Sequence, residues 1–193
     1  MRKLFLSLLV LTSIGCGSSL ANSMDGYPFQ TKLDAETTTT MFVRWTATCT
    51  PPAPSADWRI LPVSDSTLPA YTACAYARKG GPEVVIAMVV PSRGETAKDR
   101  IESFFPQRPE EVITHSQTGR KLLAEFDSDV FFFTWSARPN GATTPTVEGV
   151  VYLRKIADRP DLMLLVTGTG AYGQDPIYAS VASVLVMTDV KIH

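Results

Sequence analysis

The sequence has little net charge, few histidines and few cysteines, and each shortage disfavours a class of function. The formal net charge of the 193 residues is −1, so no basic surface for nucleic acid is predicted. The chain has two histidines and no Gly-x-Ser-x-Gly motif to present a nucleophile. Its three cysteines form no Cys-x-x-Cys pair, which disfavours structural zinc. The composition, 45% hydrophobic and 19% charged, is that of a folded domain.

Beyond the first 21 residues, no apolar run reaches the ~18 residues of a membrane helix. Residues 1–21 combine a basic tip at Arg2 and Lys3 with a short apolar run and small residues, which is the pattern of an export signal. Cleavage after Ala21 would leave a soluble chain that begins at Asn22. The first 21 residues therefore direct the protein out of the cytoplasm.

A second way of ending the signal is also open. Residues 14–19 read Ile-Gly-Cys-Gly-Ser-Ser and resemble a bacterial lipobox, in which Cys16 is the lipidated residue. Ser13 departs from that pattern, where Leu is usual, and Gly17 resembles lipoproteins sent on to the outer membrane. We prefer this interpretation, which predicts a periplasmic protein tethered to the outer membrane by Cys16, with no other membrane contact.

Setting Cys16 apart leaves Cys49 and Cys74 as a pair. In an oxidising periplasm we expect them to form a disulfide, closing a loop of about 25 residues that contributes roughly 3–4 kcal/mol in the chain-entropy model. A metal site built on these two thiolates is the weaker alternative.

Residues 22–36 are polar and small and read as a tether, so 37–193 are expected to form one domain. Alternating side chains over 37–48 predict a strand, and the segment 56–70 is expected to be irregular. Two apolar runs around the Gly80-Gly81 turn predict a hairpin. The later strands are predicted at 111–116, 121–126 after a turn at 117–119, 130–137, 147–155 and 162–167.

Two helices complete the prediction. A capping box at Thr96 opens one over 96–105, and Asp175-Pro176 opens the other, with Ile177, Val181, Val184 and Leu185 at helical spacing. We therefore predict an α+β fold, in which two helices pack on a bent antiparallel sheet of about six or seven strands.

The order of these elements over residues 37–190, together with the terminal helix 177–184, resembles the Mog1p/PsbP-like family. That resemblance implies helices packed on a strongly bent antiparallel sheet. It includes no specific motif, so it assigns no functional residue.

Residues 168–173 match Gly-x-Gly-x-x-Gly, the dinucleotide-binding pattern. Asp175-Pro176 begins the helix after the glycines, whereas a pyrophosphate needs the helix N-terminus at the second glycine. We prefer a segment that simply needs small residues, and we predict no cofactor.

His115 is the internal histidine, so an imidazole base would have to be this residue. A hydrolase that uses His115 with Asp127 or Asp129 is the alternative function. The preferred interpretation is a solvated histidine at a strand end and a turn at 127–129, since the remaining ligands of a calcium loop are missing.

The aromatic residues offer the last candidates. Most are expected in the core, but Trp58, in its proline-rich surroundings, and Tyr172 are candidates for contacting a partner at the surface. We therefore predict a non-enzymatic binding protein of a Gram-negative envelope, which engages a protein partner or a lipid-like ligand. An immunity protein that blocks a secreted toxin is one concrete form of that prediction.

Overall fold

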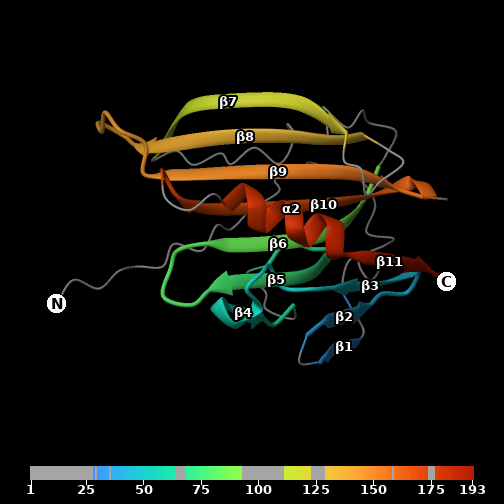
Figure 1. Ribbon diagram of the computed structural model, residues 1–193. Helices are drawn as coiled ribbons and strands as arrows, with labels where there is room; N and C mark the ends of the chain where they lie inside the picture. The colour runs from blue at the N-terminus through green and yellow to red at the C-terminus, as the bar shows by residue number, and fades with distance from the viewer. Residues whose placement is uncertain are drawn as a thin grey trace.

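The computed structural model describes residues 28, 30–34, 36–63, 68–92, 111–122, 129–157, 159–173 and 177–193, with the backbone alone at 111–122 and 129. Within these ranges the chain forms two antiparallel sheets and one α-helix (Figure 1). The smaller sheet has the strand order β1-β2-β3-β11, and the larger has β4-β5-β6-β10-β9-β8-β7. The elements are β1 (Gln30–Leu33), β2 (Thr38–Met41), β3 (Trp45–Cys49), the 3₁₀ turn η1 (Ser55–Asp57), β4 (Trp58–Leu61), β5 (Thr72–Arg78), β6 (Val84–Pro91), β7 (Glu111–Leu122), β8 (Asp129–Pro139), β9 (Val147–Ile156), β10 (Arg159–Ala171), α2 (Ile177–Met187) and β11 (Asp189–Ile192).

The predicted α+β class is wrong. The chain is mostly β, with sheets of four and seven strands where one sheet was expected. The helix predicted over 96–105 lies outside the described residues, and α2 is the one α-helix within them. The second sheet escaped prediction because two of its strands, β1 and β11, have only four residues each, which is too short for a clear alternating pattern.

The seven-stranded sheet carries buried apolar side chains on both faces. Along β10, Leu164 and Val166 belong to a cluster on one face, whereas Met163 and Leu165 belong to a cluster on the other. Successive side chains of a strand point to opposite faces, so a continuous apolar run is what a strand buried on both sides requires. The predicted hairpin of β5 with β6 and the predicted pairing of β9 with β10 are confirmed.

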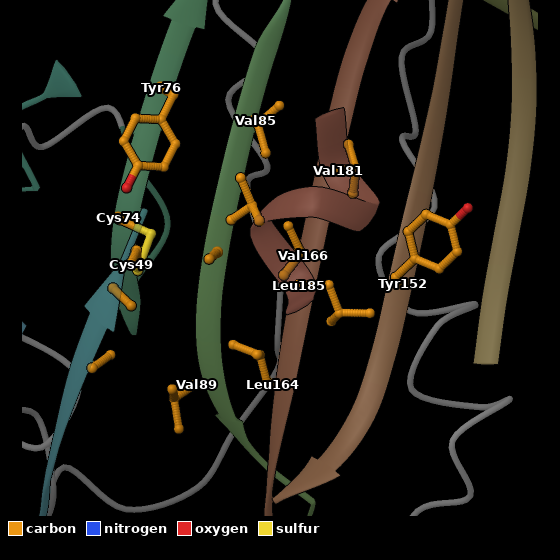
Figure 2. Packing of buried hydrophobic residues seen from close by; sticks show 14 of the residues in the cluster. Cys49, Cys74, Tyr76, Val85, Val89, Tyr152, Leu164, Val166, Val181 and Leu185 are labelled. Carbon is orange, nitrogen blue, oxygen red and sulfur yellow. A yellow bond between two sulfur atoms is a disulfide. The ribbon is translucent and has the colours of Figure 1, made fainter. Parts of the chain in front are cut away.

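The helix α2 lies across one face of this sheet, over β10 and its neighbours (Figure 1). The prediction of this helix is confirmed, since its buried residues are the four that helical spacing selected, Ile177, Val181, Val184 and Leu185. Figure 2 shows Val181 and Leu185 directed at the sheet, with the cystine and Tyr76 on one side of α2 and Tyr152 on the other.

The four-stranded sheet packs beside β5 and shares the core beneath α2. Along β3, Trp45, Ala47 and Cys49 are buried, while the alternate positions Thr46 and Thr48 are partly exposed. One face of the small sheet is therefore core, and the other carries threonine side chains that contact solvent.

A disulfide joins Cys49 on β3 to Cys74 on β5, and both residues are fully buried. The predicted pairing of these cysteines is confirmed, and the bond connects the two sheets covalently. Disulfides are typical of proteins that fold in an oxidising compartment, so this bond is consistent with an extracytoplasmic location.

Four local expectations are corrected. The strand expected over 37–48 is a hairpin, in which β2 and β3 reverse through the Phe42 N–H bond to the Trp45 carbonyl. The turn expected at 117–119 does not form, since β7 pairs with β8 along its whole length and this ladder outweighs the local turn propensity. β1 lies inside the segment read as a tether, and β4 lies inside the segment read as irregular.

Candidate functional site

A row of polar residues crosses the large sheet near the start of α2. The register pairs Ser136 on β8 with Glu148 on β9, and Glu148 with Gly170 on β10. The row continues to Glu83, just before β6, because a Cβ placed at Gly170 would lie 3.2 Å from Glu83 Cγ. Directly paired residues on adjacent strands share a face. Two buried acids, Glu83 and Glu148, therefore stand on the face that α2 covers, on either side of a glycine.

Glu83 has a basic partner. Its Oε1 atom lies 3.6 Å from Arg78 Nη1, and the Arg78 N–H donates a hydrogen bond to the Glu83 carbonyl at 2.9 Å. Its other oxygen, Oε2, is buried and has no hydrogen-bond partner among the described residues. The ion pair with Arg78 gives this acid a structural explanation, as a connection across the β5–β6 turn.

Glu148 stands in different surroundings, made by tyrosines. Tyr172 follows β10, where its N–H donates to the Thr146 carbonyl at 3.1 Å, so it lies diagonally across from Glu148. Tyr178 is the second residue of α2, and Ile177 before it lies over Gly170, with 3.6 Å between Ile177 Cβ and a Cβ placed at the glycine. Glu148 is 8% exposed and Tyr172 is 46% exposed. A buried carboxylate thus lies beneath a partly exposed aromatic surface.

Two further aromatic residues, the buried Tyr152 and the half-buried Phe132, continue this row of rings along β9 and β8. Tyr152 is on the same face as Glu148, four residues further along β9, and its ring centroid lies 6.2 Å from that of Phe132. We call this surface the aromatic shelf and define it as Phe132, Tyr152, Tyr172 and Tyr178, with Glu148 at its base.

The electrostatics of Tyr178 connect the members of the shelf. Burial raises the pKa of Tyr178, and the charge of Glu148 and the phenols of Tyr152 and Tyr172 raise it further. Burial also raises the pKa of Tyr152. The phenols of Tyr152 and Tyr178 therefore remain neutral hydrogen-bonding groups at physiological pH, and the carboxylate of the shelf is that of Glu148.

The other end of α2 meets a cation. Arg154 on β9 donates a hydrogen bond from Nη2 to the Thr188 carbonyl at 2.9 Å, just beyond the last turn of the helix. Burial lowers the pKa of Arg154, and the neighbouring Asp189 acts in the opposite direction. The helix itself has no acidic residue in its first turn and no basic residue in its last. β9 supplies both, with Glu148 near the start of α2 and Arg154 at its end, and these are the charges that a helix dipole favours at its two ends.

The glycine-rich segment is part of this packing. Gly168 and Gly170 belong to β10, and a Cβ at Gly168 would overlap Val181 Cγ2 on α2. The structure therefore favours the interpretation that residues 168–173 simply need small side chains, because α2 occupies the space above Gly168 and Gly170. The dinucleotide pattern reflects close helix–sheet contact.

Of the residues of the alternative hydrolase, the described pair His115 and Asp129 is not brought together. His115 pairs with Ser136, and Asp129 pairs with Leu122, so seven residues of β8, roughly 23 Å, separate the two positions. Asp127 lies outside the described residues. Within the described ranges, no group of three or more His, Cys, Asp or Glu residues could hold a metal ion.

The two aromatic residues predicted for partner contact have different positions. Trp58 is buried at 7% exposure, in β4 opposite Arg78, so the expectation that it lies at the surface is wrong. The proline-rich sequence around it suggested an exposed loop, but this segment contributes an edge strand to the large sheet. Tyr172 is exposed, as a partner-binding residue needs to be, and Cys16 lies outside the described residues.

Sequence reasoning missed Glu148, Tyr152 and Tyr178. The sequence did contain a signal for Glu148. Residues 148, 150 and 152 lie on the same face of a strand, and since Val150 and Tyr152 face the core, Glu148 is an acid on the core-facing side. Tyr178 could not be assigned to the shelf, because its neighbours come from β9 and from the residue after β10.

Among the described residues, no helix is long and apolar enough to cross a membrane. No protein-family model matches the chain, and no curated protein matches it. The chain is similar to the solution structure of PsbP (CyanoP) from Synechocystis sp. PCC 6803, with 10% identity, a TM-score of 0.43, and coverage of 91% of this chain and 98% of that chain. At this identity and TM-score the likeness transfers no residue, activity or partner to the present chain.

Proposed function

We propose that this protein is a non-enzymatic, extracytoplasmic binding protein that engages a protein partner through the aromatic shelf. The observation that supports the proposal is the placement of Tyr172, which is 46% exposed and lies beside Tyr178 above a buried carboxylate. Tyrosine is enriched among residues that dominate protein interfaces, because its ring buries a large area and its hydroxyl still forms hydrogen bonds.

A protein partner fits the shelf better than a lipid-like ligand. An acyl chain over these rings would bury Glu148 further without offering a hydrogen bond or a counter-charge, and uncompensated burial of a carboxylate is costly. A protein surface brings polar and charged side chains that match the phenols and the acid.

The proposed location is the periplasmic side of the outer membrane. It is supported by the export signal in residues 1–21, by the lipobox-like segment at Cys16, and by the Cys49–Cys74 disulfide. A lipid on Cys16, followed by the residues before β1 as a tether, would hold the shelf within reach of envelope proteins. An immunity protein that blocks a secreted toxin is one concrete form of this function.

Photo-crosslinking in the envelope tests this proposal. The full chain carries p-benzoylphenylalanine at position 172 in one variant and at position 43 in a control, since Val43 is a large apolar residue with 59% exposure away from the shelf. We expect a discrete adduct at 172 whose partner is identified by mass spectrometry, and none at 43. The purified partner should then bind the Tyr172→Ala variant about tenfold more weakly.

Equal adducts at both positions, or no adduct at 172 in envelopes from growing cells, would contradict the proposal. Unchanged affinity of the purified partner for Tyr172→Ala would contradict it as well, because the partner would then be bound elsewhere.

A further inference from the structure

We propose that the aromatic shelf recognises an arginine side chain, with Glu148 as the counter-charge of the guanidinium group. The inference rests on the proposed function, since it names the chemical group by which the shelf would engage its partner. It commits to a cationic ligand and leaves the identity of the partner protein open.

The first argument is the shape around Glu148. Its direct neighbour on β10 is Gly170, which has no side chain to cover the carboxylate from that strand. Tyr172 lies diagonally beyond, and the start of α2 lies above Gly170. Glu148 therefore stands between a glycine and aromatic side chains, and the residue diagonally beyond it, Tyr172, is exposed to solvent.

The second argument is a difference in charge between two acids of one row. Glu83 has Arg78 at 3.6 Å. In the part of the chain that the structure describes, no basic side chain forms an ion pair with Glu148, and α2 contributes no basic residue of its own. The α2 N-terminus supplies only the partial positive charge of a helix dipole, equivalent to about half an elementary charge. A full cation from outside would complete the compensation of Glu148.

The third argument is the chemistry of the tyrosine side chains around Glu148. The faces of tyrosine rings attract cations, and this attraction adds to that of a carboxylate. Among the biological cations, a guanidinium group is planar, stacks on aromatic rings and can form two parallel hydrogen bonds with one carboxylate. Because the Tyr152 and Tyr178 phenols are neutral, they add acceptors without adding charge. These features favour arginine over lysine.

A pair of probes with nearly the same shape tests the inference. Nα-acetyl-arginine amide and Nα-acetyl-citrulline amide differ in having a charged guanidinium or a neutral urea group. Their affinities for the full-length protein are measured from shifts of the Gly170 and Tyr172 amide resonances. The wild type should bind the arginine probe about tenfold more tightly, as expected of a hydrogen bond to a charged group.

Two matched acid variants then locate the effect. Glu148→Gln keeps the shape of the side chain, removes its charge, and should abolish the preference for arginine over citrulline. Glu83→Gln changes the neighbouring acid of the same row and should retain it. Tyr172→Leu, at an exposed position, should lower the affinity for arginine about threefold, even if Glu148→Gln fails to fold.

Equal binding of the two probes by the wild type would overturn the inference. An arginine preference that persists in Glu148→Gln, or an unchanged arginine affinity in Tyr172→Leu, would do so too. The crosslink at position 172 distinguishes failure of the arginine inference from failure of the proposed partner binding. An adduct that persists in Glu148→Gln while the probes show no preference would mean that the partner binds the shelf without an arginine.

Discussion

The two sheets of this protein satisfy the same requirement, burial of apolar surface, in different ways. In the small sheet, β2 and β3 alternate between buried and partly exposed side chains. The central strands of the large sheet, such as β6 and β10, are buried over long continuous runs. The small sheet therefore has one face in the core, and the large sheet has two. The comparison indicates that most of the stability of the fold resides in the large sheet.

The largest expected effect comes from the two faces of β10. Leu164 and Leu165 are neighbours in sequence, point to opposite faces and are both fully buried. We expect Leu164→Ala and Leu165→Ala each to lower the free energy of unfolding by about 2–5 kcal/mol, the usual cost of a buried leucine. Equilibrium denaturation with urea measures both.

The small sheet supplies the control for this pair. Thr48→Ala on the solvent face of β3 should cost less than about 1 kcal/mol. A cost below that level for Leu165→Ala would mean that the large sheet, like the small one, relies on a single face.

The next largest effect concerns the bond between the sheets. Replacing Cys49 and Cys74 together by alanine removes a cross-link with a sequence separation of 25, which should lower the free energy of unfolding by about 3.5 kcal/mol in the chain-entropy model. The denatured chain should also expand, so the denaturant m-value should rise. An unchanged midpoint together with an unchanged m-value would contradict the view that this bond holds the small sheet to the large one.

The smallest of the three effects concerns the contact between α2 and the large sheet. Gly168→Ala places a methyl group against Val181, and overpacking of this kind costs about 1–3 kcal/mol. Gly170→Ala, whose methyl group would lie 3.2 Å from Glu83 Cγ, should cost less. Thermal unfolding of the two variants measures the order. A reversed order would mean that α2 sits less closely over Gly168 than over Gly170.

The same comparison explains which elements could be predicted from the sequence. The β5–β6 hairpin, the β9–β10 pair and α2 were predictable, because each combines a long apolar pattern with a turn or a helix start nearby. The small sheet was not, because β1 and β11 are four residues long and β11 pairs with β3 only through contacts distant in sequence. Local patterns identify the elements of the core, whereas a pairing between distant parts of the chain selects the short edge strand β11.

The residues of the candidate site likewise differ in how far the sequence could predict them. Tyr172 was predictable as an aromatic residue outside any strand pattern, and Trp58 was misjudged because prolines before it obscured the edge strand β4. Glu148 and Tyr178 became a site only when β9 and α2 were placed side by side. A binding surface made from residues of several elements has no contiguous sequence signal.

The pairing of β3 with β11 also determines the order in which this protein can fold. Residues 45–48 pair with residues 189–192, so the small sheet cannot be completed until almost the whole described chain is present. Contacts this distant in sequence form slowly. For a chain that is exported as proposed, this delay keeps the small sheet incomplete until β11 has crossed the membrane. β11 would then complete that sheet on the far side.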